Sequence, residues 1–282
     1  MNPVRLAKHG VFATVHSTIS SSHFCDLDQS LSLLQFKESF SINSSASGRC
    51  HHPKTESWKE GSDCCLWDGV SCDMKTGHVT ALDLSCSMLY GTLHHNSTLF
   101  SLHHLQKLDL SDNHFNSSHI SSRFGQFFNL THLNLNFSVF ADQVPSEISH
   151  LSKLVLLDLS DNDYLSLEPI SFDKLVQNLT KLRDLNLGYV NMFLVAPNSL
   201  TNLSSSLSSL SLSGCGLQGK FPGNIFLLPN LESPSNKGLT GSFPSSNLSN
   251  VLSLMGLSNT RISVYLENNL ISNLKSLEYM SL

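Results

Sequence analysis

Cysteine is the residue whose type and spacing most suggest chemistry in this sequence, because it serves as a metal ligand, a redox nucleophile or a disulfide partner. Five of the seven cysteines lie within the first 72 residues: Cys25, Cys50, Cys64, Cys65 and Cys72. A structural zinc site usually needs a second C-x-x-C half, and the crowded segment "SDCCLWDGVSCD" lacks one. This favours disulfides over a metal or redox site. The odd total leaves at least one thiol unpaired, and Cys86 and Cys215 stay unassigned.

Histidine is the second candidate, since it occurs in the adjacent pairs His51-His52, His94-His95 and His103-His104. Neighbouring side chains diverge on a strand, and acidic or thiolate co-ligands do not recur at a useful spacing, so surface histidine is the preferred interpretation. Nucleophile-elbow, zinc-protease, phosphate-loop and kinase signatures do not occur in the sequence. We therefore expect a protein that is not an enzyme, with no catalytic residue, no bound metal and no cofactor.

Composition narrows the class of partner and compartment. A formal net charge of −5 and the lack of a basic stripe argue against nucleic acid as a partner. Eight N-x-[ST] sequons agree with the cysteines in favouring the secretory pathway, where N-glycosylation takes place. They begin at Asn43, Asn96, Asn116, Asn129, Asn136, Asn178, Asn202 and Asn247.

The first 24 residues form a weak or incomplete signal segment, because their only apolar stretch is short and interrupted by histidine. No run of about 18 apolar residues follows that could span a membrane. Any membrane attachment is thus expected through a segment that this chain does not contain, and this chain alone is expected to be soluble.

A periodic L-x-L-[SNG] pattern determines the expected architecture. It begins at Leu82, Leu108, Leu133, Leu157, Leu185 and Leu210, in steps of 26, 25, 24, 28 and 25 residues, and continues as "MGLS" and "MSL". Each unit expands to L-x-x-L-x-L-x-x-N-x-[LF], the leucine-rich repeat pattern. Alternation makes a short strand with leucines inward, and each strand stacks in parallel on the next.

Two further features of the repeat carry structural expectations. The position after each strand holds Asn113 and Asn162, which satisfy backbone groups at the turn, but Val190 at the same position puts this ladder in doubt. Several repeats continue as L-x-G-x-[FIV]-P, as in "LQGKFPGNIF", which resembles the plant-specific subclass of leucine-rich repeats with a second short strand. Pro at an edge strand is compatible with that placement.

A solenoid exposes leucines at its first coil unless a cap covers them. The segment "CDLDQSLSLLQFKESF" places Leu27, Leu31, Leu34 and Phe40 near helical spacing, with Asp26 or Asp28 as N-cap. We therefore divide the chain into the signal segment 1–24, a cysteine cap 25–75 and leucine-rich repeats 76–282. The repeats number about eight to nine, with a degenerate one at 228–245 and a truncated last one.

The cap, its tryptophans Trp58 and Trp67 and the strand "HVTALDLS" resemble the start of plant leucine-rich-repeat ectodomains, specifically receptor-like proteins of the pathogen-resistance type. The resemblance implies disulfides Cys25–Cys64 and Cys65–Cys72, and gives Cys50 no partner. A bond between the neighbours Cys64 and Cys65 would also be strained. The resemblance further implies an α/β solenoid, which is a right-handed superhelix with a concave parallel sheet.

The same resemblance implies the function. We expect the ligand-sensing extracellular part of a plasma-membrane receptor in pathogen recognition and defence signalling, with a protein or peptide ligand and a receptor kinase co-receptor. The polar, solvent-facing strand positions are the candidate binding face: Gln106, Lys107, Asp109, His132, Asn134, Arg183, Asp184, Asn186 and Tyr189. Two alternatives remain, a secreted polygalacturonase-inhibitor-like protein and a truncated non-functional fragment.

Overall fold

The structure is a computed structural model that describes residues 25–48, 50, 52–227, 230–232, 236–242, 254–256, 261–263 and 279–281. The expected signal segment 1–24 and the sequon at Asn247 lie outside the described residues.

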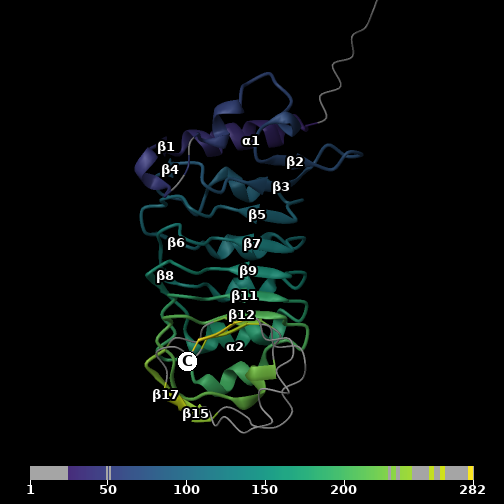
Figure 1. Cartoon of the computed structure of the whole chain (residues 1–282). Helices are drawn as coiled ribbons and strands as arrows, with labels where there is room; N and C mark the ends of the chain where they lie inside the picture. The colour runs from purple at the N-terminus through teal and green to yellow at the C-terminus, as the bar shows by residue number, and fades with distance from the viewer. Residues whose placement is uncertain are drawn as a thin grey trace, which may run out of the picture.

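One long sheet runs the length of the molecule and forms its concave face (Figure 1). Its strand order is β18-β16-β14-β12-β11-β9-β7-β5-β3-β2, and every pair is parallel except β2 with β3. The strands are β2 (Val70–Cys72), β3 (Val79–Asp83), β5 (Lys107–Asp109), β7 (His132–Asn134), β9 (Leu156–Asp158), β11 (Asp184–Asn186), β12 (Ser209–Ser211), β14 (Asn230–Glu232), β16 (Leu254–Gly256) and β18 (Tyr279–Ser281). The predicted leucine-rich-repeat solenoid is confirmed.

The repeated leucines explain the register of this sheet. Leu108 pairs with Leu133 and Leu133 with Leu157, so the first leucine of each L-x-L motif lies beside its counterpart in the next repeat. All three are buried, whereas the x residues between them point to the other side. Burying a leucine side chain contributes about 2 kcal/mol, and a register slip of one residue would expose the whole set.

The second short strand expected from the plant-type repeat is also present, at the left edge in Figure 1. Two three-stranded parallel sheets lie there, and Pro145 and Pro222 each follow one of their strands. Their strands are β6 (Ser118–His119), β8 (Phe140–Gln143), β10 (Tyr164–Ser166), β13 (Gln218–Lys220), β15 (Gly238–Ser242) and β17 (Arg261–Ser263). The return segments hold α2 (Pro169–Asn178) and the 3-10 helices η4 (Thr98–Ser101), η5 (Ser122–Gln126), η6 (Ser146–His150), η7 (Pro197–Asn202) and η8 (Gly223–Leu227).

The cap helix α1 (Leu27–Glu38) begins where the sequence predicts. The Asp26 carboxylate accepts a hydrogen bond from the Asp28 backbone N–H at 2.8 Å and so caps the helix. The buried face is different from the one that apolar spacing suggests: Leu33 and Phe36 are fully buried, whereas Leu27 is 71% exposed. Packing against the solenoid therefore determines which face of α1 is buried, and the spacing of its leucines does not.

Two stacked indole rings fill the cap between α1 and the first strand. Trp58 and Trp67 are buried with ring centroids 5.5 Å apart. The Trp58 indole N–H donates to the Asp68 carbonyl and the Trp67 indole N–H to the Ser62 hydroxyl. Both polar handles are thus satisfied, as buried tryptophan requires.

A third segment, with no counterpart in the family pattern, fastens the cap to the repeats. Cys50 is bonded to Cys86, with Cα atoms 5.5 Å apart, so two of the three cysteines without an expected partner pair with each other, and Cys215 stays free. β1 (Ser41–Ile42) lies antiparallel to β4 (Leu89–Tyr90). The Ser47 hydroxyl donates to the Asp112 carbonyl, and the Gly48 N–H donates to the Asp112 carboxylate. The cap therefore reaches the second coil.

Asparagine side chains form the turn ladder that the repeat pattern predicts. The Asn162 amide donates to three carbonyls, of Leu135, Leu159 and Ser160, and its oxygen accepts from two backbone N–H groups. Asn113 makes the equivalent five bonds two repeats earlier.

Val190 does not interrupt the sheet. It is fully buried, its own N–H donates to the Leu187 carbonyl, and β11 keeps its register with both neighbours. The backbone itself thus supplies a bond at this turn. Asn236 extends the ladder in the repeat expected to be degenerate, where it bonds Leu212 and Gly216. The L-x-L pattern missed Asn236 because the strand before it, β14, reads "NLE".

Candidate binding surface

Eight of the nine sequence-predicted binding residues lie on, or directly before, three strands of the concave sheet. β5 carries Lys107 and Asp109, β7 carries His132 and Asn134, and β11 carries Asp184 and Asn186. Gln106 and Arg183 directly precede their strands, and both are exposed. The structure therefore brings these eight residues onto one face, separated by β9.

Tyr189 lies apart from that set. It follows β11 by three residues, at a turn where its φ is 62°, and its ring packs over Gly214. The side chain is 52% exposed. It belongs to the edge of the sheet and not to its centre.

Three of the predicted binding residues have side-chain oxygens already used by the fold. The Asp109 carboxylate accepts from the N–H and the hydroxyl of Ser111. Asn134 and Asn186 accept in the same way from the N–H two residues later. These bonds end each strand in an Asx turn. The recurring Asp or Asn at this position is thus explained by the backbone before any ligand is invoked.

The second carboxylate oxygens of Asp109 and Asp158 accept hydrogen bonds from neighbouring strands. Asn134 donates to Asp109 at 3.0 Å, and Asn186 donates to Asp158 at 3.1 Å. Burial raises the pKa of Asp158, and the nearby Asp161 carboxylate adds to this, while hydrogen bonds from Ser160 and Asn186 oppose it. The resulting row of acids and amides is a structural ladder along the sheet.

A different environment surrounds Asp83, at the cap end of the same row. Its carboxylate forms an ion pair with Lys54 at 2.6 Å and accepts from the Ser85 hydroxyl. Desolvation alone would raise the pKa of Asp83, but the bonds from Lys54 and Ser85 outweigh it and lower the pKa. The cap therefore neutralises the first acid of the face.

None of the predicted binding residues forms an ion pair with another described residue, and on the sheet four of them also make no side-chain hydrogen bond: Gln106, Lys107, Arg183 and Asp184. His132 is half-buried and bonds the Thr131 hydroxyl through Nδ1. Burial and then the neighbouring Lys107 ammonium lower the pKa of His132, against the opposing pull of Asp184. The ring is therefore neutral at neutral pH, and Lys107 is the cation of this part of the face.

Val155 and Leu156 are the surface residues that the polar pattern missed. Leu156 occupies a solvent-facing position of β9, Val155 directly precedes that strand, and both are only half-buried. Leu156 pairs in register with His132 on one side and Asp184 on the other. The visible signal was the repeat "LVLLDLS", in which apolar residues stand where other repeats carry polar ones.

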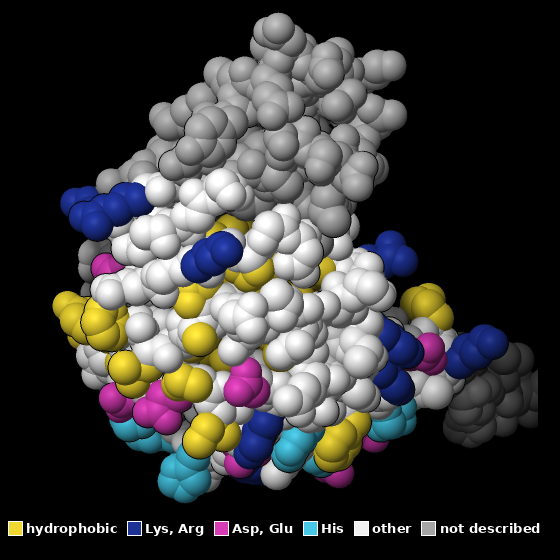
Figure 2. All heavy atoms as spheres, turned by 90° about the horizontal axis from the view of Figure 1, so that it is seen from below, with side chains coloured by type: hydrophobic (Ala, Val, Ile, Leu, Met, Phe, Trp, Pro, Cys, Tyr) yellow, Lys and Arg dark blue, Asp and Glu magenta, His cyan; other side chains and the backbone are white. Residues whose placement is uncertain are grey.

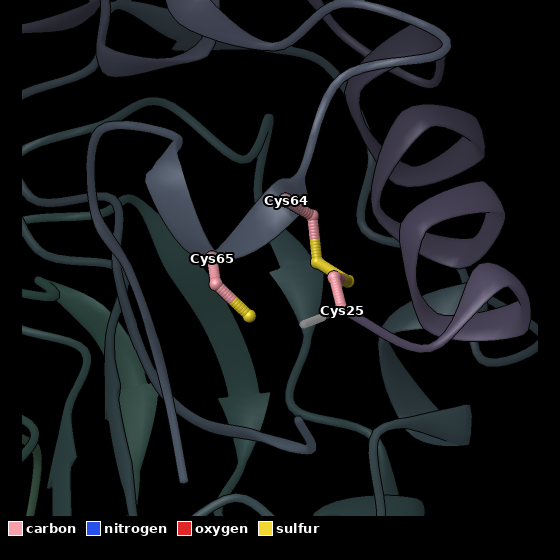
Figure 3. A group of neighbouring side chains, drawn as sticks. All are labelled: Cys25, Cys64 and Cys65. Carbon is pink, nitrogen blue, oxygen red and sulfur yellow. A yellow bond between two sulfur atoms is a disulfide. The ribbon is translucent and has the colours of Figure 1, made fainter. Parts of the chain in front are cut away.

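The crowded cysteines hold no free thiolates. Cys25 is bonded to Cys64 and Cys65 to Cys72, the two bridges that the family resemblance implies. The sulfurs of Cys25, Cys64 and Cys65 lie within 4.8 Å of one another, a metal-like spacing, and Figure 3 shows the first two joined and Cys65 separate from them. Because all three sulfurs are bridged, this group is a covalent staple.

The described histidines of the paired stretches are scattered. His52, His94, His95, His103 and His104 are all exposed. His104 stacks on His78 with ring centroids 3.9 Å apart, and Gln29 bonds the ring of His78. The remaining cysteine, Cys215, is buried, and desolvation raises the pKa of its thiol to about 11. It is accordingly a poor nucleophile.

The predicted glycosylation sites differ in accessibility. Five asparagines are exposed: Asn43, Asn96, Asn116, Asn178 and Asn202. Asn129 is half-buried and accepts from Lys153. Asn136 donates its amide nitrogen, the atom that would carry a glycan, to Ser160 and Asp161. Folding therefore competes with modification at Asn136.

Several large apolar side chains are exposed outside the concave sheet. Figure 2 shows hydrophobic side chains gathered at one side, with acidic and basic ones interspersed over the rest of the visible face. The exposed apolar side chains include Phe137, Phe193 and Leu194, and Tyr164 at the start of β10. Within the part of the chain that is described, no helix combines the length and apolarity needed to cross a bilayer.

Family models match two parts of the chain. Residues 26–73 match the leucine rich repeat N-terminal domain, and residues 104–127 and 206–228 match the Leucine Rich Repeat. The matched cap coincides with the segment that contains α1 and the paired tryptophans.

Curated relatives match most of the chain. Receptor-like protein Cf-9 of Solanum pimpinellifolium is 48% identical over 254 residues, which is 85% of this chain and 29% of that protein. Receptor-like protein 9DC1 of the same species is 44% identical over 272 residues, 91% of this chain and 31% of that one. Receptor-like protein 6 of Arabidopsis thaliana is 40% identical over 92% of this chain and 28% of its own length. The chain thus spans about three tenths of these relatives.

Solved structures share the fold. The Arabidopsis receptor kinase HAESA, in complex with the peptide hormone IDA and the co-receptor SERK1, is 26% identical with a TM-score of 0.63, over 90% of this chain and 45% of that chain. The PEPR1–AtPEP1 structure is 26% identical with a TM-score of 0.60, over 88% and 37%. A plant ice-binding protein at 23% identity and a TM-score of 0.62 shows the fold alone, over 85% of this chain and 73% of that chain.

Proposed function

This chain is a leucine-rich-repeat sequence of the plant receptor-like protein family, and we propose that it is a ligand-sensing extracellular part of such a receptor. In this role it binds a protein or peptide on the concave face and serves pathogen recognition and defence signalling. The observation that carries the proposal is the 48% identity with receptor-like protein Cf-9, which extends over cap and repeats alike.

Partners and location follow as parts of the same proposal. The HAESA structure holds both a peptide hormone and a co-receptor, and the PEPR1 structure holds AtPEP1. By analogy, this chain uses its sheet for the ligand and a receptor kinase as co-receptor, on the outer side of the plasma membrane. Disulfides in the cap and exposed sequons support an oxidising, extracytoplasmic location.

The face is physically suited to binding an extended partner without catalysis. Solvent-facing side chains from successive strands stand about 5 Å apart, so one partner chain meets many of them in turn. Lys107, Arg183 and Asp184 form no ion pair with described residues, whereas the acids and amides between them hydrogen-bond to one another. A preformed surface of this kind saves the ordering cost of binding.

Hydrogen exchange on the secreted, glycosylated chain tests the proposal. The chain is incubated with a displayed random peptide library, and the strongest binders are mapped by the backbone amides that they protect. We expect protection of the backbone amides of strands β5 to β12 and of the loops beside these strands. Binders that protect only η5, η6 and α2 on the opposite side, or a library that yields no binder, would contradict the proposed role of the face.

A further inference from the structure

Four residues at one register position form a row across the middle of the concave face. Lys107 pairs with His132, His132 with Leu156, and Leu156 with Asp184. We call these four residues the β5–β11 row. It runs along the long axis of the solenoid, across four successive strands, and all four side chains point away from the leucine core.

The surface along this row is hollowed on both sides of Leu156. A hollow of about 270 Å³ is lined by Lys107, His132 and Leu156 together with acids and amides of the ladder. A second hollow of about 250 Å³ is lined by Leu156, Asp158 and Asp184. Because Leu156 lines both, the two hollows adjoin and form one shallow groove with an apolar centre.

The charges available to a ligand differ between the two halves. Asp83 is paired with Lys54, and both oxygens of the Asp109 carboxylate accept hydrogen bonds, from Ser111 and Asn134, so Lys107 is the charged side chain of the first half that has no hydrogen-bond or ion-pair partner among the described residues. In the second half Asp158 accepts from Ser160 and Asn186, which leaves Asp184 as the free carboxylate. Arg183 precedes Asp184 but forms no ion pair with it. The side chains open to a ligand are therefore an ammonium group at β5, an apolar side chain at β9 and a carboxylate at β11.

Strand spacing converts this polarity into a sequence pattern. Adjacent strands lie about 4.8 Å apart, so Lys107 and Asp184, three strands apart, are about 14 Å from each other. An extended peptide along the row advances about 3.3 Å per residue and presents every second side chain to the sheet. Residues i and i+4 then stand about 13 Å apart, and residue i+2 falls between His132 and Leu156.

We propose that the β5–β11 row binds an extended peptide segment with an acidic residue, an apolar residue two positions away and a basic residue two positions further. The acidic side chain pairs with Lys107, the apolar one covers Leu156 and the basic one pairs with Asp184. This inference rests on the proposed function, that the concave face binds a peptide. The proposal does not fix the N-to-C direction of the peptide along the row, since either direction can present the three side chains in this order.

The test uses three labelled peptides in one Gly and Ser context, with the cores Asp-Ser-Leu-Ser-Lys, Asp-Ser-Leu-Ser-Asp and Lys-Ser-Leu-Ser-Lys. Dissociation constants on the whole secreted chain are measured by fluorescence polarisation. We expect the mixed-charge peptide to bind about fivefold more tightly than either like-charged peptide, as one partly exposed charge pair allows.

Charge-reversal variants sharpen the test, because they predict a switch and not merely a loss. Asp184→Lys is expected to prefer the diacidic peptide, and Lys107→Glu the dibasic one. Lys174→Glu, on α2, changes net charge as Lys107→Glu does but lies off the row, and it is expected to keep the original preference. A variant that misfolds would lose all three peptides and not exchange one for another.

The outcomes separate the two proposals. Peptides from the random library that protect the concave face but show no acid–apolar–basic order, together with unchanged preferences in both variants, would overturn this inference and leave the proposed function standing. A library without concave-face binders would overturn the proposed function itself, and this inference with it. The predicted exchange of preference would support both.

Discussion

The cap and the repeats cover the same kind of leucine layer by different means. The cap and its junction with the first coil, residues 25–86, contain six of the seven cysteines, all bridged, together with the stacked tryptophans. From residue 87 to residue 214 there is no cysteine at all, and the coils hold together through in-register leucines, phenylalanines and the asparagine ladder. The cap packs on the solenoid on one side only and adds covalent bonds, whereas each coil is covered by its neighbours.

The difference teaches that periodic burial makes cross-links unnecessary. The repeats stack phenylalanine as well as leucine, for example Phe115 on Phe140 with centroids 5.1 Å apart. The cap meets the solenoid at one end only, so it has one face on which to bury residues. Four experiments would break or sharpen this contrast.

Removal of the longer cap bridge should have the largest effect. Cys25 and Cys64 close a loop with a sequence separation of 39, and the chain-entropy model assigns about 4 kcal/mol of unfolding free energy to it. The double variant C25S/C64S is expected to show a strongly lowered secreted yield and an earlier first transition in urea unfolding, followed by circular dichroism.

The control for that loss is Cys215→Ser, a thiol-to-hydroxyl change in the repeats. A serine there can donate to the Leu212 carbonyl as the Cys215 thiol does, and Ser138 already occupies the same turn position in another repeat, where it bonds the Leu110 carbonyl of the preceding repeat, so the change should cost less than about 1 kcal/mol. Equal losses in the two variants would contradict the idea that the cap alone depends on bridges.

The asparagine ladder provides the next largest effect. Asn162→Ala deletes five hydrogen bonds at a fully buried position and should cost about 3 kcal/mol, because buried carbonyls lose their donors. Val190→Ala, at the same turn position of the next repeat, removes only apolar atoms and should cost about 2 kcal/mol. Urea titration of both variants measures the difference. A larger loss for the valine would mean that the ladder contributes little.

The shorter cap bridge follows. Cys65 and Cys72 are separated by seven residues, and the same chain-entropy model gives about 2 kcal/mol. C65S/C72S is expected to lower the melting temperature and the secreted yield less than C25S/C64S, with ligand contacts on the sheet unchanged. Calorimetry of the purified variants checks the order, and a melting temperature equal to that of the parent would contradict it.

The smallest expected effect compares two acids of the same row. The pKa of Asp83 is lowered, so its contribution to stability is present above the pKa of the unfolded chain and is lost as pH falls through the folded pKa. The pKa of Asp158 is raised, so stability instead falls as pH rises from the unfolded pKa to the folded one. At neutral pH, Asp83→Asn should destabilise by about 0.5 kcal/mol and Asp158→Asn should stabilise by a similar amount.

Asparagine already occupies this row at positions 134 and 186, so the substitution preserves the Asx turn in both variants. Unfolding free energies measured from pH 4 to pH 8 test the signs. The same sign for the two variants would remove the electrostatic distinction between the cap junction and the repeats.

The predictable part of this molecule is the part with a period. Leucine spacing places the strands, and the resemblance of the cap supplies the bridges of Cys64 and Cys65. The pairing of Cys50 with Cys86 has no periodic signal, because it depends on where the segment 41–48 docks in space. The helix face was misjudged for a similar reason: Leu27 has helical spacing but no neighbour to cover it.

The candidate site was predicted less completely than the fold. Polarity selected Asp109, Asn134 and Asn186, whose oxygens turn out to bond their own backbone. The same criterion passed over Leu156, since a half-buried apolar residue is indistinguishable from core in a sequence rich in leucine. Register supplied by neighbouring strands was needed to place it on the surface.

The contact between Asp112 and the segment before Cys50 determines where a chimera of this protein and a relative should be joined. In a chimera joined near residue 75, the cap would come from one protein and the second coil from another. The contacts of the segment before Cys50 with Asp112, and the bridge to Cys86, would then join residues of two different proteins. The unit to transplant is residues 25 to 113, with its sulfur bridge and its turn amide carried together.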